Sequence, residues 1–117
     1  MKQIDNISNA LTAFRMAAIT QVVATESGDY KKGNNAFDRI IKILIYLKEL
    51  GKLNELEALL PDSNIGVRMF AAYGLLSTSP KIAVPVLKEI SQRGDIHSLT
   101  AKMTLEQWEQ NTLMYPF

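Results

Sequence analysis

The chain has 117 residues, which is the size of one domain, and its 47% hydrophobic and 21% charged residues are an ordinary globular balance. Its 13 basic and 12 acidic residues give a formal net charge of +1, which offers no electrostatic argument for binding nucleic acid or a membrane. The absence of cysteine excludes disulfides, thiol catalysis and thiolate metal sites. The polar start MKQIDNISNA lacks the apolar core of a signal peptide, so we expect a cytoplasmic protein.

The first predicted helix covers the segment IDNISNALTAFRMAAITQVVATES, where apolar residues recur at three- and four-residue steps. Asp5 or Ser8 is its predicted N-cap, and Gly28 ends it.

The second predicted helix follows Asp29 as its N-cap, with Asn34 or Asn35 as the competing start, and Gly51 fits its C-terminal stop. Its apolar face is broad, which indicates a helix covered on more than one side. The residues of that face are Phe37, Ile40, Ile41, Leu44 and Leu47, widened by Ile43, Ile45 and Tyr46.

A short third helix, LNELEALL, is stopped by Pro61. The fourth follows Asn64 or Ser63 as its cap. It is rich in small residues at positions 71, 72 and 74, and such a patch lets a neighbouring helix approach closely.

The fifth predicted helix starts at Pro80, since proline suits the first helical position, and Gly94 ends it. Pro85 either kinks this helix or moves its regular part to about Ala83. The predicted apolar stripe is Ile82, Val86, Leu87 and Ile90.

The sixth predicted helix has Asp95 or Ser98 as its cap. Its predicted stripe is Leu99, Met103, part of Leu105, and Trp108. The following TLMYPF is apolar, and we expect it to pack back on the domain.

No segment alternates as a strand does, and the hairpin pairs Asn-Gly and Asp-Gly do not occur. Connections of two to six residues make successive helices antiparallel neighbours. The predicted fold is therefore all-α: about six helices in antiparallel pairs, forming a right-handed α-α superhelix fragment of the HEAT/armadillo kind in a single domain over residues 1–117.

The run from Pro61 to Ile90 resembles a HEAT-type repeat, with a Pro-Asp turn, Val67-Arg68, Ala71-Ala72 and Leu75-Leu76. With NNAFDRI at 34–40 and AKMTLEQWEQ at 101–110, the chain resembles a family of small bacterial HEAT-like proteins catalogued as domain of unknown function number twenty-nineteen. The resemblance implies an α-solenoid fragment that binds proteins. Genes of this family lie near bacterial polymorphic toxins, so it also implies immunity proteins as one use.

Seven residues are candidates for binding a partner, chosen as exposed polar side chains near the second helix and as tyrosines, which are enriched at interfaces. They are Tyr30, Lys31, Asn34, Asp38, Arg39, Lys42 and Tyr73. The competing interpretations are a local Asn34–Asp38 hydrogen bond and a solvated basic helix start.

Three other residues have a structural interpretation that we favour over a functional one. Arg68 either anchors an acidic partner or reaches Asp62 or a carbonyl of the neighbouring pair. His97, the only histidine, is expected to be solvated rather than catalytic, and Trp108 is expected in the core.

The sequence predicts no enzyme, no cofactor and no metal site, because no nucleophile, ligand set or phosphate loop stands in a suitable context. The predicted function is binding another protein, with neutralisation of a toxin domain as its specific form. The alternative is a self-associating structural or adaptor protein that dimerises through an exposed tail, Leu113 to Phe117.

Overall fold

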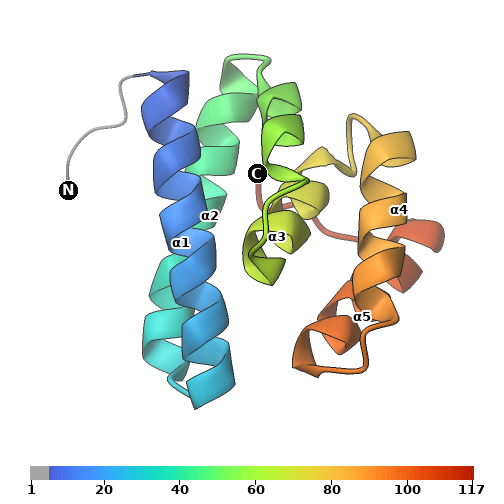
Figure 1. Ribbon diagram of the computed structural model, residues 1–117. Coiled ribbons are helices and arrows are strands. Elements are labelled where there is room, and N and C mark those ends of the chain that lie inside the picture. Colours follow the sequence, from blue (N-terminus) through green and yellow to red (C-terminus); the bar gives the residue numbers. More distant parts are fainter. Residues whose placement is uncertain (1–5) are drawn as a thin grey trace.

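The computed structural model describes residues 6–117, and all regular structure in that range is helical. The elements are α1 (Ile7–Ser27), α2 (Tyr30–Glu49), the 3₁₀ helix η1 (Leu53–Leu59), α3 (Ile65–Leu75), α4 (Pro80–Ser91) and α5 (Ile96–Glu109). Figure 1 shows α1 and α2 side by side as one long pair, α3 in the middle, and α4 with α5 on the other side. The all-α prediction is therefore confirmed for the described residues. No helix among them combines the length and apolarity needed to cross a membrane.

Three predicted N-caps are confirmed. The Asp29 carboxylate accepts a hydrogen bond from a backbone N–H of the first turn of α2, so a start at Asn34 or Asn35 is wrong. Asn64 does the same for two N–H groups of α3, and Asp95 for two of α5. Each cap satisfies donors that have no partner within the helix.

The cap of α1 differs from the prediction. Asn6 accepts from the backbone N–H of Asn9 at 2.8 Å, so Ser8 is not the cap, and Asp5 lies outside the described residues. Gly28 ends the helix in a left-handed conformation with φ 76°, which favours glycine.

Close helix approach at the small residues of α3 is confirmed. A Cβ added to Gly74 would lie 2.6 Å from Leu56 Cδ1 and 2.7 Å from Leu44 Cδ2, so η1 and α2 both press on this position. The N-terminus of α3 is crowded in the same way, because a Cβ on Gly66 would meet Val22 and lie 2.9 Å from the carbonyl oxygen of Ala18 on α1. The sequence did not single out this second approach.

The predicted apolar stripe of α5 is confirmed at Leu105 and wrong at Leu99 and Met103. Leu99 and Met103 are 60% and 50% exposed, whereas His97, Ala101 and Leu105 are buried. The hydrophobic pattern misleads here because the side of α5 that packs on the core carries a histidine and a small alanine. Trp108, in contrast, packs against the core as a half-buried residue, in agreement with the prediction.

The predicted apolar stripe of the fifth helix, which is α4, is confirmed at Leu87 and Ile90 and wrong at Ile82. Ile82 is 41% exposed, and Ala83, Leu87 and Ile90 are buried. The helix runs continuously from Pro80 with Pro85 inside it, so the alternative start near Ala83 is wrong.

Candidate protein-binding surface

Two ion pairs connect parts of the chain that are far apart in the sequence. Arg15 on α1 donates two hydrogen bonds to Asp62, from Nε to Oδ2 at 2.7 Å and from Nη2 to Oδ1 at 3.4 Å. The Asp62 carboxylate also accepts a hydrogen bond from the backbone N–H of Asn64. Arg68 on α3 donates to the carbonyl oxygen of Leu60 at 3.2 Å and pairs with Glu89 on α4 at 2.8 Å. Of the two structural partners predicted for Arg68, the carbonyl is therefore confirmed, while Asp62 belongs to Arg15.

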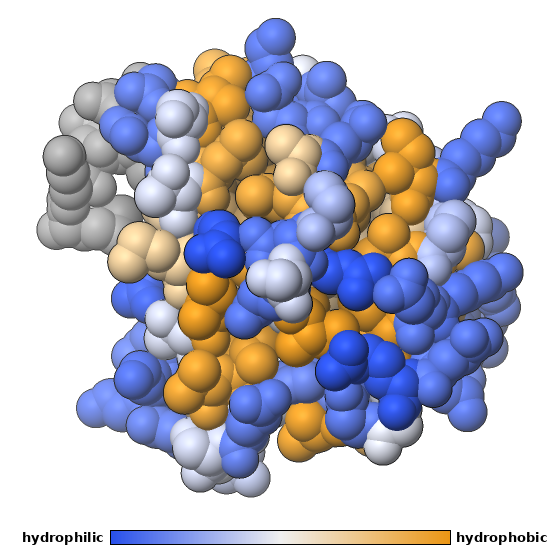
Figure 2. Space-filling model, in the orientation of Figure 1, coloured by the Kyte–Doolittle hydropathy of each residue, from blue (hydrophilic) through white to orange (hydrophobic). Residues whose placement is uncertain are grey.

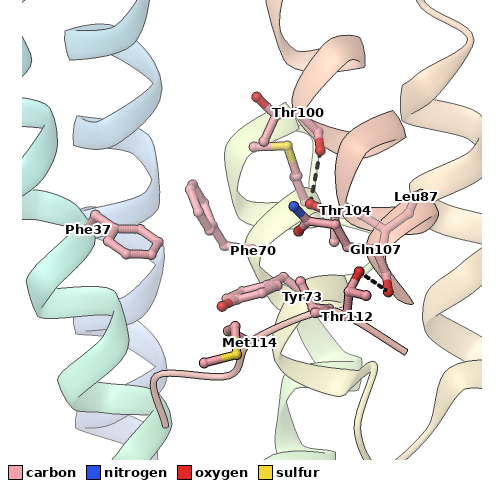
Figure 3. Close-up of a pocket in the computed structure, with 11 residues that line it drawn as sticks. Phe37, Phe70, Tyr73, Leu87, Thr100, Thr104, Gln107, Thr112 and Met114 are labelled. Atoms are coloured by element: carbon pink, nitrogen blue, oxygen red, sulfur yellow. Dashed lines mark hydrogen bonds between the residues drawn. The ribbon is translucent and has the colours of Figure 1, made fainter. Parts of the chain in front are cut away.

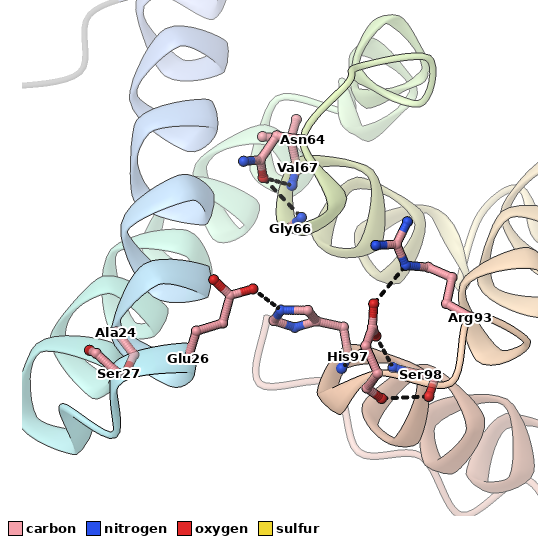
Figure 4. A network of polar contacts seen from close by, with 10 residues as sticks. Ala24, Glu26, Ser27, Asn64, Gly66, Val67, Arg93, His97 and Ser98 are labelled. Carbon is pink, nitrogen blue, oxygen red and sulfur yellow. Dashed lines mark hydrogen bonds and ion pairs between the residues drawn. The ribbon is translucent and has the colours of Figure 1, made fainter.

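His97 is not solvated as predicted: it is 3% exposed, and its Nε2 lies 2.9 Å from Oε2 of Glu26. Figure 4 shows Glu26 reaching from the end of α1 toward the ring of His97 in the first turn of α5. This contact joins the first and last helices, so His97 has a structural role. Among residues 6–117, no three His, Asp or Glu side chains gather closely enough to hold a metal ion.

A cavity of about 370 Å³, which we call the aromatic hollow, opens between α2, α3 and α5. Phe37 of α2 and Phe70 and Tyr73 of α3 point into it in Figure 3, and the two phenylalanine rings have centroids 6.2 Å apart. The volume is within the ordinary range of ligand pockets, which are mostly apolar with a few polar groups.

The α5 side of the aromatic hollow is polar. Thr100, Thr104 and Gln107 line it, at the three- and four-residue spacing of one helix face. The Thr104 hydroxyl is used within the helix, since it donates to the carbonyl oxygen of Thr100 at 2.9 Å. The Gln107 side chain is left facing the hollow with both a donor and an acceptor.

The C-terminal segment, residues 112–117, closes one end of the aromatic hollow. Phe117 meets Tyr73 edge-on with centroids 5.5 Å apart, and Tyr115 stacks on Tyr73 at 6.4 Å. Lys48 Nζ donates to a main-chain oxygen of Phe117 at 2.9 Å. The prediction that this segment packs back on the domain is therefore confirmed, and the description of it as an exposed tail is wrong for Leu113, Tyr115 and Phe117, which are half-buried.

Burial changes the pKa of two tyrosines that pack together here, Tyr73 and Tyr115. It raises the pKa of the Tyr73 phenol above its ordinary value, and the neighbouring Tyr115 raises it further. Burial likewise raises the pKa of Tyr115. Both phenols are thus held neutral, which suits an apolar contact surface.

An exposed apolar stripe lies beside the aromatic hollow on α5. It consists of Ile96, Leu99 and Met103, which we call the α5 stripe. Met103 lies one position before Thr104 and three after Thr100, so the stripe borders the polar wall of the hollow. Two of these residues, Leu99 and Met103, are ones that the sequence placed in the core.

A second apolar area lies over α1. Met16 and Val23 are exposed there, seven positions apart on one side of the helix. In Figure 2 apolar surface runs down α1 and into the middle of the same face, where hydrophilic side chains interrupt it.

The seven predicted site residues do not form one surface. Tyr30 and Asn34 follow the helical spacing that leads to Phe37, on the side of the aromatic hollow, and Tyr30 is 81% exposed. Tyr73 lies inside the hollow, half-buried under the C-terminal segment.

The basic members of the set lie apart from the hollow. Lys31 and Arg39 line a shallower polar cavity of about 310 Å³ together with Thr20 on α1. Lys42 continues that side of α2 at helical spacing, and Asp38 is exposed. The alternative Asn34–Asp38 hydrogen bond is absent from the part of the chain described here.

The sequence pattern did not identify three parts of the site: Phe37, Phe70 and the polar side of α5. An aromatic residue at helical spacing looks the same in a sequence whether it fills a core or lines a cavity. Only the meeting of α2, α3 and α5 distinguishes the two.

No protein-family model matches the chain, and no curated protein matches it. The fold is similar to the crystal structure of the protein RPA1889 from Rhodopseudomonas palustris CGA009, with a TM-score of 0.86 and 21% sequence identity over 96% of this chain and 98% of that one. At this identity the likeness concerns the fold alone. The resemblance to the HEAT-like family stays a prediction.

Proposed function

We propose that the chain is a protein-binding module, a short HEAT-like right-handed stack whose aromatic hollow receives part of a partner protein. The aromatic hollow carries this proposal, because Phe37, Phe70 and Tyr73 offer an apolar floor beside the hydrogen-bonding side chains of α5. Aromatic side chains of this kind dominate the energetics of protein interfaces.

A binding role accounts for the α5 stripe better than a structural one. Ile96, Leu99 and Met103 are each at least half exposed, and the exposed half of each side chain adds nothing to the burial that stabilises the fold. An apolar patch next to a cavity is typical of an interaction site. Catalysis has less support, because the only histidine is buried and occupied by Glu26.

Neutralisation of a toxin is the specific form of this function that we propose, and it rests on the resemblance to the HEAT-like family. The net charge of +1 gives little electrostatic steering, so apolar contact must supply the affinity. Homodimerisation through residues 113–117 is the alternative, and it requires these residues to leave the site they occupy on their own chain.

The test is affinity capture from the source organism with three proteins in parallel. Wild type is compared with Thr104→Trp, which fills the aromatic hollow, and with Lys52→Glu, an exposed charge change away from it. We expect a partner that wild type and the control retain and Thr104→Trp loses, with circular dichroism confirming that the variants are folded. Gln107→Arg, on the exposed edge of the hollow, replaces Thr104→Trp if that variant unfolds. A partner retained by a folded hollow variant contradicts the proposed site.

The toxin form is tested by co-expression with the protein encoded by the adjacent gene. We expect growth to be rescued by wild type and by Lys52→Glu, and not by the hollow variant. Failure of wild type to rescue any toxic neighbour contradicts the toxin form and leaves the binding module in place.

A further inference from the structure

We propose that the aromatic hollow binds an extended segment of the partner that carries alternating apolar and aromatic side chains. The chain's own C-terminal segment covers part of the same surface until the partner displaces it. We call this surface, which consists of the aromatic hollow and Lys48, the track. This inference rests on the proposed binding function and names the kind of segment that binds.

The C-terminal segment shows what the track accepts. Residues 112–117 have no helical structure, and their side chains alternate. Leu113, Tyr115 and Phe117 are half-buried on the domain, whereas Met114 is 83% exposed and Pro116 is exposed. An exposure pattern with a period of two is that of an extended chain lying along a surface with one side down.

The contacts of this segment combine aromatic packing with one main-chain hydrogen bond. Tyr115 and Phe117 both pack on Tyr73, and their own rings meet edge-on at 5.6 Å. Lys48 supplies the hydrogen bond to the main chain at Phe117. A partner segment with aromatic residues two apart would make the same contacts, because they require only two aromatic rings and a main-chain oxygen.

The track continues beyond the part that the segment fills. The 370 Å³ of the aromatic hollow is lined on one side by residues 112–114 themselves and on the others by Phe37, Phe70 and the α5 wall. A longer partner segment gains this unfilled volume and the Gln107 amide, which the C-terminal segment does not use. It therefore has more contacts available than the segment it displaces.

The contacts that bind the C-terminal segment are weak enough for a partner segment to replace it. Its contact residues are only half-buried, and the Lys48 side chain that binds it is exposed. An exposed hydrogen bond of this kind competes with water, so its net contribution is small.

The experiment uses the full chain with the segment released by Tyr115→Ser and Phe117→Ser together. The probe is a fluorescein-labelled peptide of sequence NTLMYPF, matching residues 111–117, and binding is followed by fluorescence anisotropy. We expect the probe to bind the released variant at least ten times more tightly than wild type, with one peptide per chain. Pro116→Ala, in the same segment but exposed and outside the lining of the hollow, is the matched control and should bind like wild type.

A peptide in which both aromatic residues are serine should bind neither protein. Equal affinity of the probe for wild type and the released variant overturns the proposal. If the released variant does not fold, Phe117→Ser alone replaces it, because this change removes one ring of the segment and leaves the surface beneath it unchanged. A gain in probe affinity over wild type then supports displacement, and no gain overturns it.

Three further outcomes bear on this inference and on the proposed function. A captured partner that depends on the hollow but binds the released variant no better than wild type overturns the displacement while the binding function stands. Tight probe binding without any captured partner supports the track's preference for aromatic peptides and counts against the proposed function. A wild-type dimer that becomes monomeric in the released variant places the segment in a second copy and overturns displacement by another protein.

Discussion

His97 Nε2 lies 2.9 Å from Glu26 Oε2, and this contact spans 71 positions of the chain. It joins the end of α1 to the start of α5 at a point where these two helices otherwise touch little. The ring is almost completely buried, while the carboxylate is about half exposed. A buried polar side chain that loses its partner still pays its desolvation cost. The contact therefore contributes more to stability than the exposure of the Glu26 carboxylate indicates.

Replacing His97 with alanine should therefore destabilise the fold by about 2 kcal/mol, because it removes the hydrogen bond and leaves a cavity between the helices. Urea unfolding followed by circular dichroism measures this. Glu26→Gln keeps a hydrogen-bonding group and should cost less. Glu49→Gln, at the exposed end of α2, is the control and should change nothing. An His97→Ala variant as stable as wild type would show that the contact is dispensable.

Alanine substitutions at two glycines should have opposite effects. Gly66→Ala places a methyl group against Val22 and the Ala18 carbonyl, so we expect a loss of about 2 kcal/mol or more. Gly33→Ala meets only Ala24 Cβ at 3.5 Å, an ordinary contact, and should gain up to about 1 kcal/mol from helix propensity. Denaturation midpoints of both variants measure the difference. The close α1–α3 approach is contradicted if Gly66→Ala is neutral.

Replacing the cap of α3 should weaken that helix. Asn64→Ala removes the acceptor for two backbone N–H groups, and such caps contribute about 1 kcal/mol. Ser63→Ala, one residue earlier and exposed, is the matched control. Thermal unfolding of the two variants should separate them by several degrees. Equal melting temperatures would mean that the cap contributes nothing to stability.

Stability should fall in acid because of Asp62. The hydrogen bond from Arg15, and then the N–H of Asn64, hold the pKa of this carboxyl below its usual range. Its contribution is present above the ordinary aspartate pKa of about 4 and is lost as the pH falls through the lower folded value. Asp62→Asn should therefore lose stability at pH 6 and very little at pH 2, as measured by urea midpoints. An equal loss at both values would assign the effect to something other than the charge.

Alkaline pH should release the C-terminal segment. Burial raises the pKa of Tyr73 and Tyr115, so folding favours their neutral forms. Their contribution is complete below the ordinary tyrosine pKa of about 10 and is lost as the pH rises through the higher folded values. Proteolysis of the segment at rising pH should accelerate above pH 10 in wild type and less so in a Tyr73→Phe, Tyr115→Phe double variant. Identical rates would separate the segment from these phenols.

Much of the fold follows from local sequence. Asp29, Asn64 and Asp95 were identified as caps because a short acceptor side chain satisfies N–H groups only a few residues away. The close approach at Gly74 was also foreseen, since the lack of a side chain can be read directly. The second glycine approach, at Gly66, was missed because its partners Val22 and Ala18 lie on a helix far earlier in the chain.

The candidate site depended on tertiary structure throughout. The sequence placed Leu99 and Met103 in the core and His97 in solvent, and the packing of α5 reverses all three. It grouped Tyr73 with the basic residues of α2, whereas α3 and the C-terminal segment place it in the aromatic hollow. The helix caps are set by neighbours along the chain, so the sequence by itself determined where most of the helices begin. Which side of each helix is buried depends on side chains up to 71 positions away, and only the packed structure decides that.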